Sequence, residues 1–308
     1  MTHPSHYRTG ILCAALGAIA FSGKAIIVKL GYRYGADAVT LLMYRMLFAL
    51  PFLLLLAWWS GRGKPTLTRA DWLGVIGLGF IGYYLSSLLD FLGLQYISAS
   101  LERLILYLNP TLVLIFGVLF YRKRVPSVQA IAMLVSYGGV LVVFGHELSL
   151  AGVHVALGSA LVFLSATTYA IYLGYSGQIV QRIGSLRLAG LATSAACCFC
   201  LIHFVSTRPL SAFAVNSPVL WLSLLNATLC TVVPVLLVML AIERIGAALA
   251  AQVGMIGPIA TISMSTLILG EPFTPWVMAG TVLVVLGVYL VTKFSQQKTF
   301  ITKESNHV

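Results

Sequence analysis

The chain has 308 residues, of which 59% are hydrophobic and only 9% are charged, and its mean hydropathy is +0.97. A soluble domain carries about a quarter charged residues, so this composition excludes a soluble globular protein and predicts an all-α integral membrane protein in the lipid bilayer. The net charge is +11, but the basic residues lie mostly in short segments between apolar runs, where they orient a membrane protein. A nucleic-acid partner is therefore not predicted.

Ten apolar runs are long enough to cross a membrane as helices, which takes about 20 residues each. In chain order they lie near residues 10–30, 39–59, 72–94, 98–120, 127–144, 153–175, 186–206, 218–240, 246–269 and 275–293. The segments between these runs are short. No soluble domain is therefore available to hold a catalytic site.

The distribution of lysine and arginine predicts the orientation of the ten spans, because cytoplasmic loops carry an excess of both. If the N-terminus is cytoplasmic, 13 basic residues flank the spans on the inner side and 3 on the outer side. The inner residues are Arg8, Arg62, Lys64, Arg69, Arg122, Lys123, Arg124, Arg182, Arg187, Arg244, Lys293, Lys298 and Lys303, and the outer ones are Lys29, Arg33 and Arg208. Both termini are predicted to be cytoplasmic.

The stretch from residue 98 to residue 129 recurs at an offset of 148 positions. Pro110 falls on Pro258, and Gly139 falls on Gly287 without a gap. An offset that holds over this length indicates an internal duplication.

The duplication divides the chain into a five-helix repeat at 7–144, a second repeat at 153–294, and a cytoplasmic tail at 295–308. An odd number of spans in each repeat forces the second copy to be inverted in the membrane. Inverted repeats are the architecture of secondary transporters, in which the two halves give inward-open and outward-open states of similar energy.

Two stretches carry a family resemblance. Near the end of the chain stands LILGEPFTPWVMAGTVLVVLGVYL, with Gly270-Glu271 before the last span, and near the beginning stand IVKLGY and LMYRMLFALPF, with Lys29 and Arg45. They resemble the repeat of the drug/metabolite transporter superfamily, in particular its EamA-type ten-helix carriers, and the resemblance covers nearly the whole chain. It implies a carrier in the inner membrane of a bacterium. One departure is that Arg122-Lys123 stand where the first repeat should have Gly-Glu.

Charged residues inside the predicted spans occur only in the first half: Lys24, Arg45, Asp90, Glu102 and Arg103. A charge at the centre of a membrane helix costs at least ~2.5–3.5 kcal/mol, so it is normally paired or faces a wet cavity. Counting about 1.5 Å of rise per residue places all five in the outer half of the membrane, which predicts a single cluster. Three cations against two carboxylates leave one positive charge, whose partner would be a substrate carboxylate or phosphate, or a lipid headgroup.

Two interpretations of these charges stay open. They can form structural ion pairs that lock helices together, or snorkel to the surface; alternatively, they can line a substrate cavity. Lys24 is the deepest of them. We expect it to face a wet central cavity, where it either meets an acidic substrate group or completes a charge pair that gates the cavity.

Helical spacing suggests further residues of the cavity wall. Tyr83, Ser86 and Asp90 share one face of the third span, and Glu102 and Asn109 share one face of the fourth. The candidate substrate-binding or cavity residues are Lys24, Tyr83, Ser86, Asp90, Glu102, Arg103, Tyr107, Asn109, Thr168, Tyr172, Asn226 and Gln252. Each uncharged one, taken alone, is more typical of an interhelical hydrogen bond than of a ligand contact.

Two prolines mark a helix break in each half. Pro110, which shares a face with Arg103 and Tyr107, and its counterpart Pro258 each remove a backbone donor near the middle of a span. Interruptions at corresponding positions of the two halves point to the binding region of a transporter. The alternative is a packing kink, since proline is common in membrane helices.

No enzymatic activity is predicted. Gly174-Tyr175-Ser176-Gly177 resembles the GxSG of intramembrane serine proteases, but Ser176 ends the sixth span on the inner side and His203 lies near the outer end of the seventh. They are much farther apart than the ~3 Å that base-assisted attack requires. The five cysteines lie inside apolar runs without the spacing of a zinc site, so neither a metal site nor a cofactor is predicted.

The sequence therefore predicts a secondary transporter that moves a small amphipathic metabolite, such as an amino acid, by alternating access. The resemblance suggests export as the direction. The alternative is a non-transporting sensor or assembly factor built on a transporter scaffold. No oligomeric state is predicted.

Overall fold

The computed structural model describes residues 4–121 and 126–305, and within these ranges the chain forms helices and no strands. This confirms the all-helical prediction for the described part. Eight helical stretches there are long and apolar enough to cross a membrane, and two shorter apolar helices cover residues 254–269 and 275–291. A helix satisfies its own backbone donors and acceptors, which is what a chain surrounded by hydrocarbon requires.

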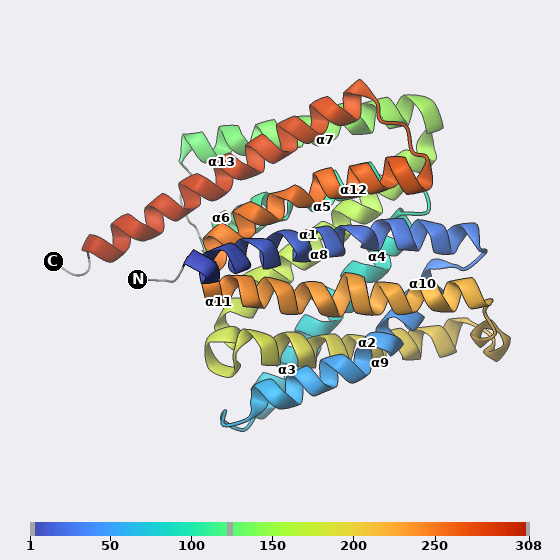
Figure 1. Ribbon diagram of the computed structural model, residues 1–308, viewed down its shortest axis with the longest axis horizontal. Coiled ribbons are helices and arrows are strands. Elements are labelled where there is room, and N and C mark those ends of the chain that lie inside the picture. Colours follow the sequence, from blue (N-terminus) through green and yellow to red (C-terminus); the bar gives the residue numbers. More distant parts are fainter. Residues whose placement is uncertain (1–3, 122–125, 306–308) are drawn as a thin grey trace.

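The helices follow one another along the chain with short links (Figure 1). Those of the first half are α1 (Pro4–Arg33), α2 (Ala38–Gly61), α3 (Arg69–Leu78), η1 (Gly79–Leu85), α4 (Ser86–Gly93), α5 (Ala99–Leu106), α6 (Asn109–Tyr121) and α7 (Ser127–Ala151). Those of the second half are α8 (Val153–Ile183), α9 (Ser185–Thr207), η2 (Leu210–Phe213), α10 (Ser217–Ala227), η3 (Thr228–Val232), α11 (Val233–Val253), η4 (Gly254–Ile256), α12 (Gly257–Met264), η5 (Ser265–Leu269) and α13 (Pro275–Ser305).

Irregular turns occur at corresponding places in the two halves. The third predicted span contains the π-helical segment η1, and the eighth contains the π-helical segment η3 at the equivalent position. The fourth predicted span is interrupted between α5 and α6, and the ninth is interrupted by the 3₁₀ turn η4 ahead of α12. The single continuous helix that the sequence suggested at 98–120 is therefore two shorter helices.

Gly246 separates the eighth helical stretch from the ninth. Its backbone has φ 80° and ψ 157°, and the chain turns there inside α11. A positive φ of this size is readily adopted only by glycine. The turn explains why the ninth predicted span begins at residue 246.

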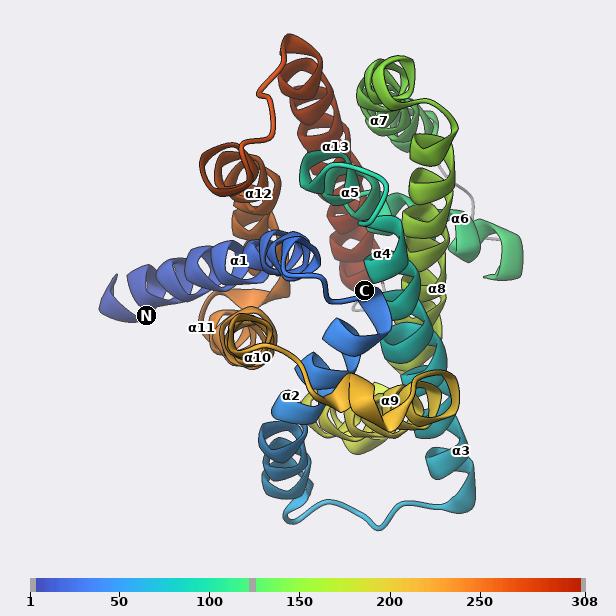
Figure 2. The ribbon, with the colours of Figure 1, turned by 90° about the vertical axis from the view of Figure 1, so that its right-hand side faces the viewer.

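Most of the extensive helix packing joins the first half to the second. Helix α1 packs along α11, α2 along α9, α4 along α8, and α7 along α13. Figure 2 looks along the molecule from the end opposite the termini and shows α1 lying between α12, α10 and α5. The two halves are therefore intertwined rather than placed side by side as separate domains.

Close backbone contacts recur with the two halves exchanged. A Cβ added at Gly139 in α7 would lie 2.7 Å from the carbonyl oxygen of Gly280 in α13. A Cβ added at Gly287 would lie 2.6 Å from the carbonyl oxygen of Ala132. At the offset of 148, Gly139 corresponds to Gly287 and Ala132 corresponds to Gly280. The two contacts therefore join the same two positions of the repeat, with the halves exchanged.

A second pair of contacts has the same property. A Cβ at Gly10 would meet the side chain of Ile245 at 2.5 Å, and a Cβ at Gly158 would meet that of Ile97 at 2.8 Å. Reciprocal contacts, in which position i of one half touches position j of the other and the reverse, are the mark of a two-fold relation.

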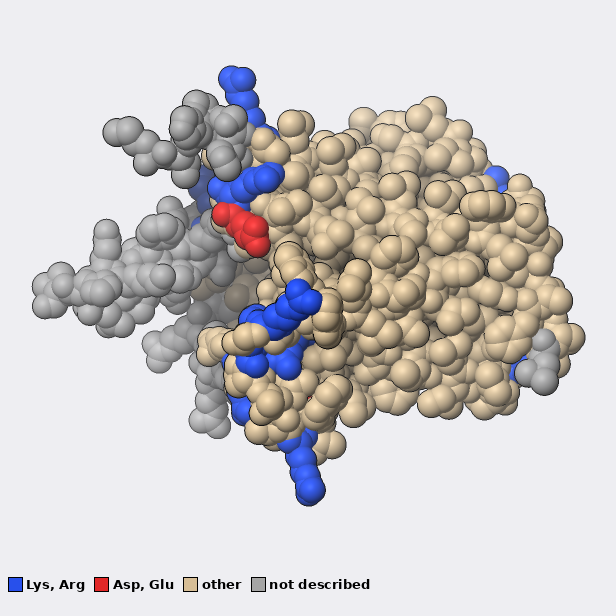
Figure 3. Space-filling view, turned by 60° about the horizontal axis from the view of Figure 1, so that its bottom comes forward, with Lys and Arg blue, Asp and Glu red and all other residues tan. Residues whose placement is uncertain are grey.

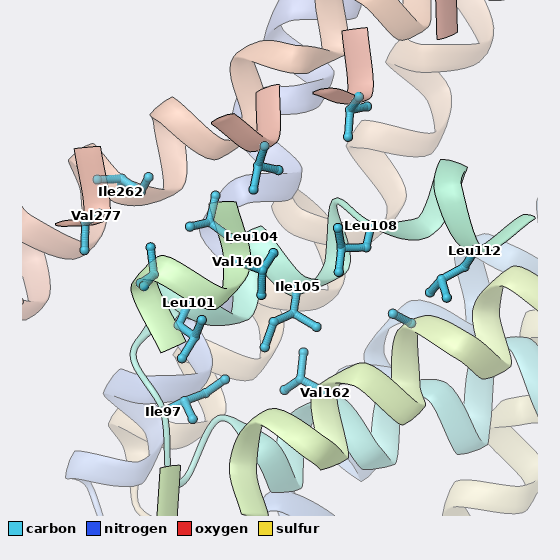
Figure 4. Close-up of a cluster of buried hydrophobic side chains, with 14 of the residues drawn as sticks. Ile97, Leu101, Leu104, Ile105, Leu108, Leu112, Val140, Val162, Ile262 and Val277 are labelled. Atoms are coloured by element: carbon cyan, nitrogen blue, oxygen red, sulfur yellow. The ribbon is translucent and has the colours of Figure 1, made fainter. Parts of the chain in front are cut away.

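An extensive apolar core lies between α5, α7, α8 and α13, with Ile262 of α12 at its edge. Figure 4 shows Leu101, Leu104 and Ile105 of α5 directed towards side chains of the neighbouring helices, including Val162 and Val140. This core fixes α5 in place. It therefore positions the charged residues that α5 carries on another face.

The two ends of the molecule differ in charge. Both termini lie at one end, together with the α2–α3 and α8–α9 links (Figure 1). Figure 3 shows lysine and arginine side chains gathered at that end, while the middle of the visible face is uncharged. The predicted basic cluster Arg122-Lys123-Arg124 falls in 122–125, outside the described residues.

Candidate functional site

Three charged side chains from three helices meet inside the bundle. The ammonium of Lys24 in α1 lies 2.5 Å from Oδ2 of Asp90 in α4 and 3.2 Å from Oε1 of Glu102 in α5. Lys24 is 6% exposed, Asp90 3% and Glu102 0%. The structure thus brings the three together as one buried, ion-paired group.

Lys24 donates a hydrogen bond to Asp90. Its approach to Glu102 is close enough for an ion pair, but both Glu102 oxygens and Oδ1 of Asp90 are buried and have no hydrogen-bond partner among the residues that the structure describes. Buried polar atoms are usually hydrogen-bonded, and an unpaired one costs free energy. The group therefore has unused acceptor capacity.

Two buried arginines lie on either side of these carboxylates, and neither forms an ion pair within the described ranges. The Arg45 Nε donates to the hydroxyl of Thr231 at 3.0 Å, and its guanidinium lies 5.5 Å from the ring centre of Phe91. One terminal nitrogen of Arg45 has no hydrogen-bond partner. Asp90 is the nearby carboxylate that acts on Arg45 electrostatically.

Arg103 occupies the other side of the cluster, next to Glu102. A terminal nitrogen of its guanidinium donates to the hydroxyl of Ser22 at 3.0 Å, while its Nε has no partner. The rings of Phe21 and Tyr107 lie 5.2 and 5.4 Å from the guanidinium carbon. Cation–π contacts of this kind hold a guanidinium in a fixed plane.

The helix break in the second half is covered by side chains from the first. Because Pro258 has no N–H, it cannot donate to the carbonyl of Gly254 four residues earlier. The hydroxyl of Tyr107 donates to that carbonyl at 2.5 Å, beside the 3₁₀ bond from the N–H of Gly257. The hydroxyl of Ser22 lies 2.9 Å from the carbonyl oxygen of Gly257 and 2.7 Å from that of Ala18 in its own helix, and its single proton can serve either of them.

The break before Pro110 changes one expectation. Asn109 was expected to share a helix face with Glu102, but α5 ends at Leu106 and α6 begins at Asn109, so the regular spacing does not continue between them. The Pro110 residue is exposed, whereas Pro258 is buried. The carbonyl oxygen of the Asn109 side chain is buried without a partner.

The remaining candidates lie in other contacts. Tyr83 and Tyr172 place their hydroxyls 3.1 Å apart, and Ser86 lies 3.1 Å from the hydroxyl of Ser165. Thr168 donates to the backbone of its own helix.

The two amide candidates of the second half, Asn226 and Gln252, lie near irregular turns of the backbone. Asn226 has an unpartnered side-chain oxygen next to the π-helical segment η3. Gln252 is half-buried near the end of α11. The structure therefore places Tyr83, Tyr172 and Ser86 in helix–helix contacts and the charged candidates Lys24, Asp90 and Glu102 in the central cluster.

Ser22 and Thr231 are the partners that the sequence did not identify. Ser22 lies two positions before Lys24, and serine is an unremarkable residue in a membrane helix, so only its contacts reveal its role. Thr231 binds Arg45 because the π-helical turn η3 places it there: its hydroxyl also donates to the carbonyl of Asn226, five residues back, at 2.9 Å.

The Gly270-Glu271 pair has a defined place at the end opposite the termini. Gly270 ends η5 with φ 72°, in the left-handed region that favours glycine. The carboxylate of Glu271 accepts bonds from the N–H of Ala99 at 3.0 and 3.1 Å and lies 3.3 Å from the ammonium of Lys29. It therefore caps the start of α5 and helps line a pocket of about 310 Å³.

The residues of the protease-like motif are not assembled into a catalytic pair. The hydroxyl of Ser176 donates to the carbonyl of Leu173 in its own helix, and Nδ1 of His203 lies 2.9 Å from the hydroxyl of Tyr84. Each side chain has a different partner.

Helices that break opposite one another around a buried charge cluster are characteristic of membrane transporters. Comparison with known proteins agrees with this class. The model of the EamA-like transporter family matches the chain twice, at residues 8–145 and 156–293, and these matches begin 148 residues apart. The chain belongs to the EamA-like transporter family.

Individual relatives support the same assignment. The chain is 33% identical over 277 residues to uncharacterized transporter YcbK of Bacillus subtilis (strain 168), which covers 85% of this chain and 86% of that protein. It is 23% identical over 287 residues to an uncharacterized transporter of Archaeoglobus fulgidus, covering 93% and 98% of the two chains. One crystal structure with 16% sequence identity has the same fold, with a TM-score of 0.63 over 94% of this chain and 97% of that one.

Proposed function

We propose that this membrane transporter is a secondary carrier that moves a small amphipathic metabolite, such as an amino acid, by alternating access. Its two halves, 7–144 and 153–294, would be five-helix repeats inverted with respect to each other, which gives ten spans. The observation that carries this proposal is the reciprocal packing between the halves, with Gly139 on Gly280 and Gly287 on Ala132. Two interchangeable halves give two conformations of similar energy, each open to a different side.

The substrate site is proposed to lie at the buried charge cluster and the helix break beside it. Lys24 with Asp90 and Glu102 forms the ion-paired group, and Arg103 and Tyr107 face the break at Gly254. Because the cluster is closed to solvent here, substrate access requires that helices α1, α4 and α5 separate from their partners in the second half.

The orientation is proposed to put both termini in the cytoplasm of a bacterial cell, with the carrier in the inner membrane and working as an exporter. The concentration of basic side chains at the termini end supports this orientation (Figure 3). A reporter enzyme that is active only in the periplasm, fused after Asn306 in the tail outside the described residues, should give no signal. Strong activity of that fusion would contradict the ten-span count.

Flux through liposomes tests the transport proposal. Purified protein reconstituted into lipid vesicles should accelerate the exit of at least one metabolite from a loaded mixture, relative to empty vesicles and to a Lys24→Met variant. A sensor or assembly factor on the same scaffold would bind a ligand without accelerating its flux. Unchanged efflux of every metabolite in the mixture, from vesicles that contain folded protein, would support that second function.

A further inference from the structure

We propose that Arg103, together with the hydroxyls of Tyr107 and Ser22, forms the subsite for a carboxylate of the substrate. In the closed conformation these hydroxyls contact the backbone carbonyls at the break of the second half. The hydroxyl of Tyr107 donates to the carbonyl of Gly254, and that of Ser22 lies within hydrogen-bond distance of the carbonyl of Gly257. The inference rests on the proposed transport function, since it names the substrate class of the same site.

The charge of the cluster calls for an anion. At their ordinary charges the five buried groups comprise three cations and two carboxylates, and Lys24 contacts both carboxylates. One positive charge is left over, and Arg103 has no ion-pair partner in the part of the chain that the structure describes. An uncompensated buried charge is strongly unfavourable, so an anionic ligand would stabilise this arrangement.

Arg103 is the arginine placed where a substrate would bind. A Cβ added at Gly257 would lie 2.7 Å from a terminal nitrogen of Arg103 and 2.8 Å from the hydroxyl of Tyr107. Both groups therefore point at the start of α12, whose N-terminal end carries a partial positive charge that favours anions. Arg45 instead binds Thr231 at η3.

The donors match a carboxylate. A guanidinium offers parallel N–H groups with the spacing of the two carboxylate oxygens, and here one of its donors, the Nε of Arg103, is buried and unused. The hydroxyls of Tyr107 and Ser22 are also donors. That of Tyr107 donates to the carbonyl of Gly254 at the break, and that of Ser22 lies within hydrogen-bond distance of the carbonyls of Gly257 and Ala18. The rings of Phe21 and Tyr107 flank the guanidinium and hold it in place.

This arrangement couples binding to the conformational change. The carbonyl of Gly254 accepts a 3₁₀ bond from the N–H of Gly257 and a second bond from the hydroxyl of Tyr107, which takes the place of the N–H that Pro258 lacks while the break is packed against α5. If α12 moves away from α5, water can satisfy that carbonyl, and the same hydroxyl becomes free to bind the substrate. A carboxylate would therefore compete with the break itself for the donors and favour separation of the two halves.

Binding by purified protein tests the proposal without using transport. Thermal unfolding in detergent is measured with amino acids and with their carboxamides, for example leucine and leucinamide, and with phosphatidylglycerol as an anionic lipid. At least one carboxylate should raise the unfolding midpoint, while its carboxamide should not. If carboxylates and carboxamides stabilise equally, if no carboxylate stabilises, or if only phosphatidylglycerol does, the proposal is wrong.

Three variants locate the subsite. Arg103→Lys, which keeps the charge but loses the fork, should weaken carboxylate binding by roughly tenfold or more. Tyr107→Phe should also weaken it, whereas Arg182→Gln, which removes a positive charge from the exposed side chain paired with Asp71, should leave it unchanged. If Arg103→Lys does not fold, the matched ligands and Tyr107→Phe still decide the outcome.

The binding and flux experiments can fail independently, so they distinguish a wrong subsite from a wrong transport function. Carboxylate-specific binding without flux in vesicles would leave the subsite standing and refute transport. Flux of a metabolite that is equally fast with Tyr107→Phe and Arg103→Lys would leave transport standing and refute the subsite.

Discussion

The two halves of the molecule share their backbone irregularities but not their buried charges. Both halves have a π-helical turn in the third span and a break in the fourth, at corresponding positions. The five buried charges Lys24, Arg45, Asp90, Glu102 and Arg103 correspond, at an offset of 148, to Tyr172, Thr193, Val238, Ala250 and Ala251. The duplicated backbone geometry is kept in both halves, while the buried charges of the described residues all lie in the first half.

This difference separates two requirements of a carrier. Under the proposed alternation between two states, the two halves need similar mechanics, and the reciprocal glycine contacts are consistent with that requirement. Substrate recognition needs charges at one place only, because one substrate is bound at a time. We therefore expect substitution of a buried charged residue in the first half to reduce stability and transport strongly. Substitution of the uncharged residue at the matching position of the second half should have a weak effect.

The largest expected effect is that of Lys24→Met, which leaves Asp90 and Glu102 buried without their ion-pair partner. Removing one partner of a buried ion pair costs about 3–5 kcal/mol, so the unfolding midpoint in detergent should fall sharply and flux in vesicles should be lost. Tyr172→Phe, at the matching position, loses one hydroxyl contact with Tyr83 and should cost only about 1 kcal/mol.

A triple variant separates charge from function. Adding Asp90→Asn and Glu102→Gln to Lys24→Met neutralises the two carboxylates that have lost Lys24 but leaves Arg45 and Arg103 buried without them, so stability should recover only in part while transport stays absent. Full flux in Lys24→Met, with wild-type affinity, would show that the charge is incidental. Equal losses of stability in Lys24→Met and Tyr172→Phe would contradict the prediction that the two halves differ in the importance of these positions.

The next largest effect concerns the symmetric part of the structure. Gly139→Ala places a Cβ against the backbone of Gly280 in α13, and overpacking of this kind costs about 1–3 kcal/mol. Gly138→Ala, at the adjacent position with nothing within 4 Å, should be neutral or slightly stabilising, since alanine is the better helix former. Thermal unfolding of the two variants compares them directly, and equal midpoints would argue against tight α7–α13 packing.

Sequence patterns predicted two features of the site. They indicated the helix breaks, and they predicted that Lys24, Asp90 and Glu102 lie in one cluster. Periodicity placed the apolar runs, and an approximate depth count brought together charges that lie in three different helices. Both follow from the regular rise of an α-helix, which makes position along the chain a measure of position across the bundle.

The failures occur where that regularity ends. Asn109 was placed on the face of Glu102 by counting turns, but α5 stops at Leu106. Thr231 reaches Arg45 from a π-helical turn, and nothing in the sequence marks such a turn. Proline signals the break at Pro258, yet only the structure shows that Tyr107 supplies the missing donor.

A third comparison concerns Glu271 and its repeat counterpart Lys123, a residue outside the described ranges. Glu271 caps α5 and pairs with Lys29, so Glu271→Ala should lower stability by about 1–2 kcal/mol. Glu271→Gln keeps an acceptor for the N–H of Ala99 and should lose less. Chemical or thermal unfolding of both variants tests this order, and equal losses would show that the ion pair with Lys29 matters and the cap does not.

The smallest effect is expected at Asp37, which caps α2 where its repeat counterpart is Ser185, the first residue of α9. The Asp37 carboxylate accepts from the N–H groups of Val39 and Thr40 and pairs with Arg208 at 2.8 Å. Burial raises the pKa of Asp37, but the hydrogen bonds from Thr40 and Arg208 outweigh burial and hold the pKa below its ordinary value. The charged form is thus favoured in the folded protein.

The sign of the pH dependence follows from that lowered pKa. The stabilisation by Asp37 is fully present above the unfolded-state pKa of about 3.9 and is lost as the pH falls through the folded-state value. Asp37→Ala should lower stability by about 1 kcal/mol at pH 7, and the difference from wild type should shrink towards pH 3. Asp37→Asn keeps an acceptor for the backbone N–H groups, so its smaller deficit reports the contact with Arg208 together with the bond from the hydroxyl of Thr40. Unfolding midpoints measured at both pH values check this, and a deficit of Asp37→Ala that grows on acidification would show that the carboxylate is not held in its charged form.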